Sequence, residues 1–343
     1  MPADRPKRPT MAQVARLAGV SPTTVSFVIN DDPRGSAVPA ATRLRVEEAV
    51  RALGYRPNHA ARRLRTQRSE TIGFITDEVA TTAFAGDTIR GAHDAAWARH
   101  HLLTVLNTGG APEVEEASVD TVLSRDVDGV IFAAMYTREV TPPRGLEDVR
   151  TVLLNCFTTS GRYPSVVPAE MAGGRAATRI LLEAGHRRIG FVNGLPTTYA
   201  AGRRLEGYRQ ALREYGVSYD QALVRHGTYR SDSGHAHVRD LLLGDDPPTA
   251  IFCASDRMAV GAYYAIKELG LSIPGDVSVV GYDNQIELAA YASPPLTTIQ
   301  LPHYEMGRWA AEYLLDGGPA GPVPHEIDCP AVIRDSVAPP RTG

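Results

Sequence analysis

The spacing of apolar residues changes along the chain. Up to about residue 55 they recur every three or four positions, which is typical of short amphipathic helices. From residue 71 onward, short runs of consecutive apolar residues alternate with helical segments. Such runs are typical of parallel strands covered on both faces. The pattern predicts a small all-α head followed by a larger α/β core.

The head is predicted to hold a helix-turn-helix at residues 11–30. Thr10 and Gln13 form a capping box at the start of an apolar-striped helix that Gly19 ends. Ser21 can cap the next helix and Pro22 suits its first position, so only a three-residue turn separates the two. That spacing is typical of helix-turn-helix units. A third helix is expected to bury Val46, Ala49, Val50 and Leu53 and to end at Gly54.

Residues 58–69 are predicted to form a hinge helix and linker. Asn58 can cap a helix of only about seven residues, which is marginal in isolation because it cannot recover its nucleation cost. Something outside the segment must stabilise it. The alternative is that "ARRLRTQR" is a plain basic linker.

The core is predicted to contain two α/β series of similar length, one from residue 71 and one from near residue 165. This pattern indicates two doubly wound lobes whose ligands bind beyond the carboxyl ends of the strands, in a cleft between the lobes. The strand segments are "TIGFITDEV", "LLTVLN", "GVIFAAM" and "TVLLNCF", then "RIGFVNG", "ALVRHG", "AIFCAS" and "VSVVGYD". Helices are expected near 87–99, 113–124, 171–184, 203–215, 233–243 and 257–269.

Charge divides the 343-residue chain in the same place as the hydrophobic pattern. Residues 1–70 hold 13 Lys and Arg against 6 Asp and Glu, a net charge of +7, whereas the remainder carries −10. A basic head on an acidic body indicates contact with a polyanion at one end. Cys156, Cys253 and Cys329 are far apart, which favours buried free thiols over a metal site. With no secretory h-region and no long apolar window, we expect a cytoplasmic protein without a membrane segment.

Ordered motifs along nearly the whole chain resemble those of the LacI/GalR family of bacterial transcriptional regulators. They include "MAQVARLAGVSPTTVSFVIN", "ATRLRVEEAVRALGYRPNHAARRLRT", "LLEAGHRRIGFVNG" and "PPTAIFCASDRMAVGAYYAIKELGLSIPGDVSVVGYDN". The resemblance implies a homodimer with DNA-binding heads and a core similar to periplasmic sugar-binding proteins. A small effector between the lobes, expected to be a mono- or oligosaccharide, would change the affinity for double-stranded operator DNA.

The expected domains follow from this resemblance. The head spans 1–57, the hinge and linker 58–69, and the core 70–343. Within the core, the N-lobe is expected at about 70–164 and 298–323, and the C-lobe at about 165–297 and 324–343.

The resemblance also implies a set of DNA contacts. Pro22, Thr23 and Phe27 match positions that contact bases, and Thr10, Ser21, Thr24, Ser26 and Asn30 match positions that contact phosphates, which set register. The remaining candidates are Tyr55, Asn58, Ala61, Arg62 and Leu64, with Leu64 as a wedge into the minor groove. Phe27 departs from the family, which commonly has Arg or His there. Its ring either faces the groove, where it can pack on a thymine methyl, or folds back over the head's own core.

Six cleft positions are implied as effector contacts. They are Phe84, Arg204, Tyr229, Ser255, Asp256 and Asp283. Arg204 could fork to vicinal hydroxyls, and Asp283 ends a strand where a ligand is expected. Alternatively, Phe84 only packs and Asp256 only caps a helix. Ala169 and Ser255 replace the Asp and Asn that are frequent in the family.

Two other classes of protein fit less well. The common catalytic motifs are missing, and "SDSGHAH" is expected to be the opening of a helix capped by Ser231. A stand-alone sugar-binding protein would need a secretory signal and no basic head. We therefore predict a sequence-specific DNA-binding repressor, with no enzymatic activity, cofactor or metal.

Overall fold

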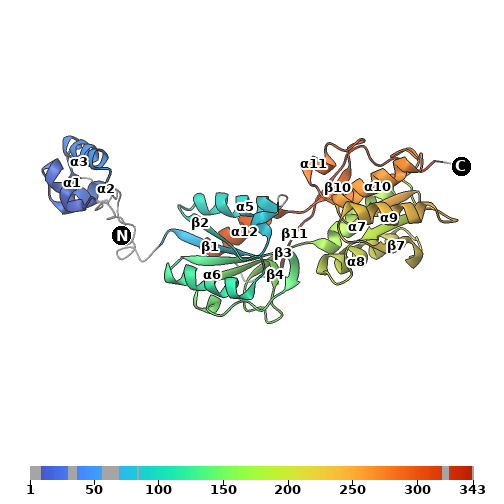
Figure 1. Cartoon of the computed structure of the whole chain (residues 1–343), viewed down its shortest axis with the longest axis horizontal. Coiled ribbons are helices and arrows are strands. Elements are labelled where there is room, and N and C mark those ends of the chain that lie inside the picture. The colour runs from blue at the N-terminus through green and yellow to red at the C-terminus, as the bar shows by residue number, and fades with distance from the viewer. Residues whose placement is uncertain (1–8, 30–36, 56–68, 83–84, 319–323, 342–343) are drawn as a thin grey trace, which may run out of the picture. The chain divides into compact units, whose positions relative to one another are not determined.

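The computed structural model forms two compact units, residues 1–69 and residues 70–343, which are described separately (Figure 1). The residues it describes are 9–29, 37–55, 69–82, 85–318 and 324–341.

The head is a bundle of three helices. Thr10 and Gln13 close the predicted capping box, with the Thr10 amide donating to Gln13 Oε1 at 2.7 Å. Gly19 ends the first helix in the left-handed conformation, with φ of 65°. Val14, Val25 and Val46 meet in the core, one from each helix, and confirm the helix-turn-helix. The helices are α1 (Met11–Ala18), α2 (Pro22–Ile29) and α3 (Ala40–Leu53).

The N-lobe contains a six-stranded parallel sheet in the order β2-β1-β3-β4-β5-β11. Helices α5 and α12 pack on one face of the sheet and α6 on the other. The strands are β1 (Thr71–Thr76), β2 (Leu102–Asn107), β3 (Gly129–Glu139), β4 (Thr151–Phe157), β5 (Ser165–Pro168) and β11 (His325–Ile327). The helices are α5 (Gly86–Trp97), α6 (Pro112–Ser124) and α12 (His303–Asp316), with 3₁₀ turns η2 (Val79–Thr81) and η4 (Leu146–Asp148).

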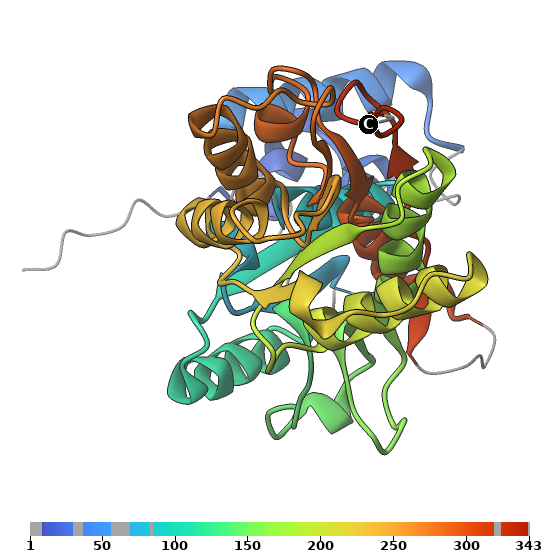
Figure 2. The ribbon, with the colours of Figure 1, turned by 90° about the vertical axis from the view of Figure 1, so that its right-hand side faces the viewer.

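The C-lobe repeats this topology in the order β7-β6-β8-β9-β10-β12, with only β12 antiparallel. In Figure 2, α9 and α10 (gold to brown) lie on one side of its sheet and α7 and α8 (yellow-green to yellow) on the other. The strands are β6 (Ile189–Asn193), β7 (Val224–His226), β8 (Ala250–Cys253), β9 (Ser278–Asp283), β10 (Thr297–Gln300) and β12 (Ala331–Val332). The helices are α7 (Glu170–Glu183), α8 (Tyr199–Glu214), α9 (Ser231–Leu242), α10 (Asp256–Glu268) and α11 (Ile286–Ala289), with the turn η5 (Gln221–Leu223).

The chain crosses between the lobes a few residues later than expected. Residues 165–168 are expected in the C-lobe, but they form β5, which pairs with β4 through Leu153 and Ser165 and extends the N-lobe sheet. Residues 298–300 belong to β10 of the C-lobe sheet, and 325–327 to β11 of the N-lobe sheet. The difference arises because a short apolar run does not indicate which of two parallel sheets it joins. No helix in the described part of the chain is long and apolar enough to cross a membrane.

Three helix pairs in the core cross at facing glycines. In the pair α5 and α12, a Cβ at Gly307 would overlap the carbonyl oxygen of Thr88, and a Cβ at Gly91 would overlap that of Tyr304. Gly174 and Gly207 bring α7 and α8 together in the same way, and Gly234 and Gly261 join α9 and α10. Backbone therefore touches backbone in each pair, which fixes the positions of the helix ends that carry functional side chains.

We expect Gly307→Ala to destabilise the core by about 1–3 kcal/mol, because the added methyl group must push α12 away from α5. Thermal or denaturant unfolding of the full chain measures this effect. Gly202→Ala is the matched control, since a Cβ there meets nothing within 4 Å in α8. It should leave stability unchanged or raise it by up to about 1 kcal/mol. Equal effects of the two substitutions would contradict the close packing.

Candidate functional site

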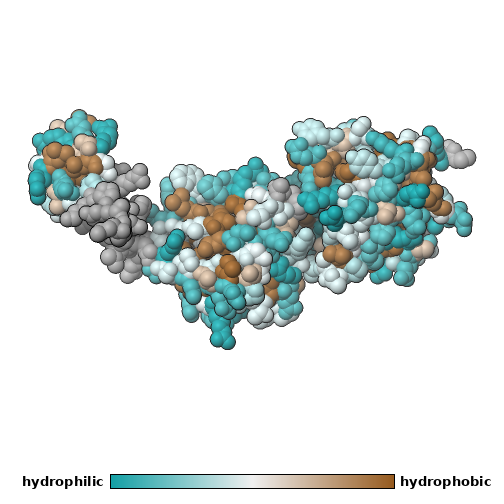
Figure 3. Space-filling model, viewed as in Figure 1, coloured by the Kyte–Doolittle hydropathy of each residue, from teal (hydrophilic) through white to brown (hydrophobic). Residues whose placement is uncertain are grey.

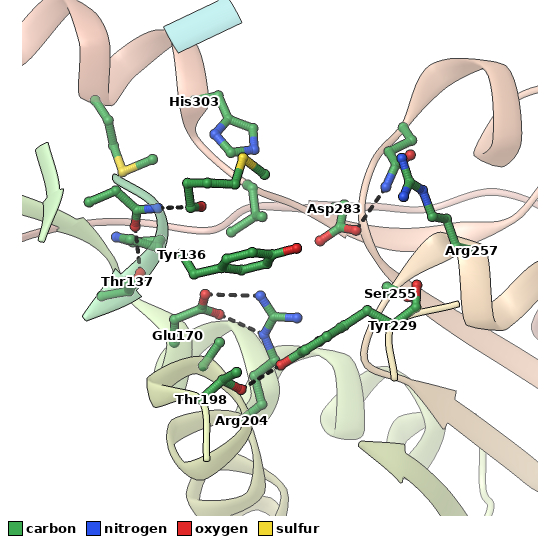
Figure 4. Close-up of a pocket in the computed structure, with 17 residues that line it drawn as sticks. Tyr136, Thr137, Glu170, Thr198, Arg204, Tyr229, Ser255, Arg257, Asp283 and His303 are labelled. Atoms are coloured by element: carbon green, nitrogen blue, oxygen red, sulfur yellow. Dashed lines mark hydrogen bonds and ion pairs between the residues drawn. The ribbon is translucent and has the colours of Figure 1, made fainter. Parts of the chain in front are cut away.

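A cavity lies where the carboxyl ends of the strands of both sheets face each other. It encloses about 710 Å³ of empty space, counting its opening to solvent. This is the position expected for a ligand in doubly wound folds. Figure 4 shows its polar side chains. The N-lobe contributes Tyr136, Thr137, Asn155 and His303, and the C-lobe contributes Glu170, Thr198, Arg204, Tyr229, Ser255, Arg257 and Asp283.

Four of the six predicted effector residues line this cavity: Arg204, Tyr229, Ser255 and Asp283. Phe84 lies outside the described residues. Asp256 is fully buried and is not among the residues that line the cavity. Its carboxylate accepts hydrogen bonds from Thr298 Oγ1 at 2.6 Å and from the Gln285 amide at 2.7 Å. Asp256 therefore ties α10 to β10 and to the segment after β9, and burial raises its pKa to about 8.

Arg204 is buried and already engaged within the protein. Its Nε and Nη2 donate to the two carboxylate oxygens of Glu170 at 2.7 and 2.9 Å, and both side chains are only 3% exposed. Nη1 donates to the carbonyl oxygen of Ala254 at 2.6 Å. One face of the guanidinium stacks on the ring of Tyr282, 3.6 Å from its centroid. Burial alone would lower the pKa of Arg204, but the negative charge of Glu170 raises this pKa by more than burial lowers it. The guanidinium therefore stays protonated.

Asp283 ends β9 and turns its carboxylate to the cavity (Figure 4). One of its oxygens accepts from Gln285 Nε2 at 3.0 Å. Its enclosure raises the pKa to about 7. Hydrogen bonds from a ligand's hydroxyl groups would favour the ionised form and take the place of lost water.

Ser255 and Tyr229 complete the C-lobe wall. Ser255 caps α10, since its Oγ accepts from the Met258 amide at 3.2 Å, so the capping role foreseen for Asp256 belongs to its neighbour. The hydroxyl groups of Tyr229 and Thr198 are hydrogen-bonded at 2.9 Å. Gly194 leaves room for the Tyr229 ring, which any Cβ there would overlap.

Three residues on the cavity wall hold a left-handed backbone without being glycine. Their φ angles are 56° at Asn155, 62° at Tyr229 and 108° at Asp283. Such conformations cost of order 1–3 kcal/mol each and persist only where the surroundings impose them. Three of the seven non-glycine residues with positive φ in the described chain therefore lie on this wall, and such conformations often occur at ligand sites.

The N-lobe wall is a bulge in β3 that the sequence analysis did not identify. The β3–β4 register shifts between Ala133 and Arg138. Asn155 holds the bulge, donating to the carbonyl oxygens of Ala134 and Met135 at 3.0 and 2.9 Å and accepting from Thr137 Oγ1 at 2.5 Å. The bulge presents Tyr136, which is 54% exposed and points into the cavity (Figure 4). Bulges beside binding sites redirect side chains in this way.

His303 begins α12 on the same wall. Its Nδ1 lies 3.4 Å from Thr88 Oγ1. Burial lowers its pKa to about 4, so the imidazole is neutral at physiological pH. It therefore adds polarity to the cavity without adding positive charge.

The second helix of the head presents the predicted contact residues. Ser21 caps α2 by accepting from the Thr24 amide at 3.0 Å, while Pro22 and Thr23 are exposed. Phe27 is half-buried and is not part of the head core. The Tyr55 side chain is buried in that core, and its contact with DNA stays a prediction. Asn30, Asn58, Ala61, Arg62 and Leu64 lie outside the described residues.

The two histidines of the "SDSGHAH" segment contact different partners. Helix α9 begins at Ser231, so Ser231 is its first residue and not its cap. His235 Nε2 contacts Glu268 at 2.7 Å, and His237 Nε2 contacts the carbonyl oxygen of His226. Among the described residues, no group of three His, Cys, Asp or Glu could hold a metal ion. The three cysteines are buried and free, as predicted.

Comparison with known proteins identifies the family. Residues 10–58 match the model for bacterial regulatory proteins of the lacI family, and residues 178–337 match a periplasmic binding protein-like domain. The ribose operon repressor of Escherichia coli is 34% identical, with 89% of this chain and 92% of that protein covered. The chain belongs to the lacI family of bacterial regulatory proteins.

Solved structures of lacI-family regulators agree with this assignment. A lac repressor dimer bound to operator and the anti-inducer ONPF has a TM-score of 0.80 at 27% identity, covering 97% of this chain and all of the other. The complex of the transcriptional regulator CelR with cellobiose has a TM-score of 0.66 at 32% identity, covering 96% of this chain and all of the other. The fold predicted from sequence, a helix-turn-helix head and a two-lobed α/β core, is thereby confirmed.

Proposed function

We propose that this lacI-family regulator is a repressor that binds a pseudo-palindromic operator as a homodimer and responds to a sugar-like effector. It acts by binding alone, in the bacterial cytoplasm and at the nucleoid when on its operator. The observation that carries the proposal is the cavity between the lobes, lined by Arg204 and Asp283, in a chain with a helix-turn-helix head. Three relatives support the proposal: a ribose operon repressor, a regulator solved in complex with cellobiose, and a lac repressor dimer solved on its operator.

The polar groups of the cavity suit a polyhydroxylated ring. Asp283 can accept from hydroxyl groups, and Arg204 can donate to them. Tyr136 and Tyr229 offer aromatic faces from opposite lobes for the apolar faces of a sugar. These four residues, with Ser255 and Thr198 beside them, form the proposed effector site.

The DNA-binding surface is the exposed side of α2 with the hinge that follows the head. Pro22, Thr23 and Phe27 are proposed to face the major groove, and Thr10, Ser21, Thr24, Ser26 and Asn30 the phosphates. Asn58, Ala61, Arg62 and Leu64 are proposed to form the hinge, with Leu64 as the wedge between base steps.

The dimer is proposed to form across the edge strand β2. Figure 3 shows an apolar patch on the N-lobe between α5 and α6, where β2 ends the sheet. Leu102 and Val105 of β2 are exposed, as are Trp97 at the end of α5 and Val114 of α6. An exposed edge strand with apolar neighbours is a template for pairing with another chain, and a second copy fits a two-fold operator.

The effector is tested by a thermal-shift screen of mono- and disaccharides against the full chain. A sugar that stabilises the protein should also change operator affinity. Asp283→Asn should weaken that sugar by about 10- to 100-fold, the value of one or two charge-assisted hydrogen bonds. Asp283 is substituted in preference to Arg204, because removing Arg204 would leave Glu170 as a buried uncompensated charge and destabilise the fold.

Asp245→Asn, in the exposed segment after α9, is the control for the loss of one carboxylate and should bind the sugar like the wild type. A stabilising sugar that leaves operator affinity unchanged would refute the regulatory role. Equal affinities of the Asp283 and Asp245 variants would refute the pocket assignment.

Phe27 predicts the base preference of one operator position. A phenyl ring can contact a thymine methyl but cannot donate to guanine, so the half-site should not require G opposite Phe27. Phe27→Arg should shift the preference toward G by about 1–3 kcal/mol. Selection of binding sites from random DNA with both proteins measures this shift.

Leu17→Arg adds the same charge to the exposed side of α1 and serves as the control. It should change affinity similarly for all sequences, because a phosphate contact carries no sequence information. If Phe27→Arg left the preference at every position unchanged, the ring would belong to the packing of the head.

The dimer interface is tested by Val105→Lys in sedimentation experiments on the full chain. Two lysines brought together on the edge strands should raise the dimer dissociation constant by at least about tenfold. Ile333→Lys, at an exposed apolar position of the C-lobe, should sediment like the wild type. A Val105→Lys protein that remains as dimeric as the wild type would place the interface elsewhere.

A further inference from the structure

The positive charge of Arg204 in the cavity is balanced by a carboxylate of the protein itself, that of Glu170. Glu170 is the first residue of α7. Its two carboxylate oxygens accept hydrogen bonds from Nε and Nη2 of Arg204 (Figure 4). Both side chains are almost fully enclosed by protein. Their charges cancel inside the site before any ligand arrives.

The contacts of Arg204 leave it able to donate hydrogen bonds to a ligand, while Glu170 neutralises its positive charge. A guanidinium has five N–H groups, and among the described residues three of them donate: two to Glu170 and one to Ala254. The two that remain, one on each terminal nitrogen, can donate to a pair of neighbouring hydroxyl oxygens. Tyr282 covers one face of the group and prevents approach from that side.

The other polar groups of the cavity do not supply a buried positive charge. His303 is neutral at physiological pH, and Asp283 is acidic. Arg257 lines the cavity but is exposed, so solvent and salt screen its charge. An anionic ligand beside Arg204 would therefore lose its hydration and meet the carboxylate of Glu170.

We propose that Glu170 is a specificity-determining residue that restricts this cavity to uncharged ligands by holding Arg204 in a formally neutral ion pair. The inference rests on the proposed function only in taking this cavity as the effector site. It excludes aldonates, uronates and sugar phosphates as effectors, and it assigns to Arg204 the role of a double hydrogen-bond donor. The same guanidinium without Glu170 would be a site for an anion.

The test uses inorganic phosphate as the probe, with the full-length protein and isothermal titration at constant ionic strength. The wild type should show no saturable phosphate binding. Glu170→Gln keeps the shape of the side chain but removes its charge, and it should bind phosphate at least about tenfold more tightly than the wild type. The double variant Glu170→Gln/Arg204→Gln should lose this gain, because it removes the cation as well.

Chloride at matched ionic strength controls for the general stabilisation that phosphate gives to folded proteins. Saturable phosphate binding by the wild type that is lost in the double variant Glu170→Gln/Arg204→Gln would overturn the proposal. So would a folded Glu170→Gln protein with no gain in phosphate affinity. If Glu170→Gln does not fold, Glu170→Ala takes its place, and the wild-type measurement decides independently. A sugar screen without any stabilising ligand would refute the effector function while leaving these phosphate results unaffected.

Discussion

The close approach of α7 and α8 is the constraint on which the C-lobe wall of the cavity depends. A Cβ at Gly174 would lie 2.6 Å from the carbonyl oxygen of Arg204, so a larger residue would hold the two helices apart. Glu170 starts α7 one turn before this contact and reaches Arg204 with both oxygens. The guanidinium then joins further elements, through Ala254 after β8 and Tyr282 in β9. Helix packing thus positions a buried ion pair, and the ion pair fixes the wall.

The two walls of the cavity are built by different means. The C-lobe wall uses the buried charges of Arg204 and Glu170, which are tolerated because they pair with each other. The N-lobe wall uses a strand bulge held by the amide of Asn155, with Asp77 accepting from the Met135 amide at 2.9 Å. Asp77 also accepts from Arg138 at 2.9 Å, which anchors the far end of the bulge. Both walls are therefore preorganised before a ligand binds, which lowers the entropy cost of binding.

The architecture could be predicted from the sequence because it depends on local signals, such as the capping box at Thr10 and the apolar runs of the strands. The sequence also placed Arg204, Tyr229, Ser255 and Asp283 on one cavity, through their matches to family positions. Glu170 was missed because residues 165–168 are expected in the C-lobe, so a polar residue two positions beyond them does not stand out as following the end of an N-lobe strand. Tyr136 depends on a bulge, and bulges have no spacing signal of their own. The burial of Asp256 depends on Thr298, which is 42 residues away.

A ligand can change a two-lobed protein only if it interacts differently with two arrangements of the lobes. The cavity meets this condition, because Tyr136 and Asp283 approach it from different lobes. The chain crosses between lobes beside these groups: Glu170 follows β5, and His303 opens α12 after β10. A ligand that contacts both walls therefore acts where the connecting segments begin. In the sequence, residues 58–69 directly precede the start of the N-lobe, where the Glu70 amide donates to Asp128 at 2.9 Å. A shift of the N-lobe would therefore act on residues 58–69 through the covalent chain itself.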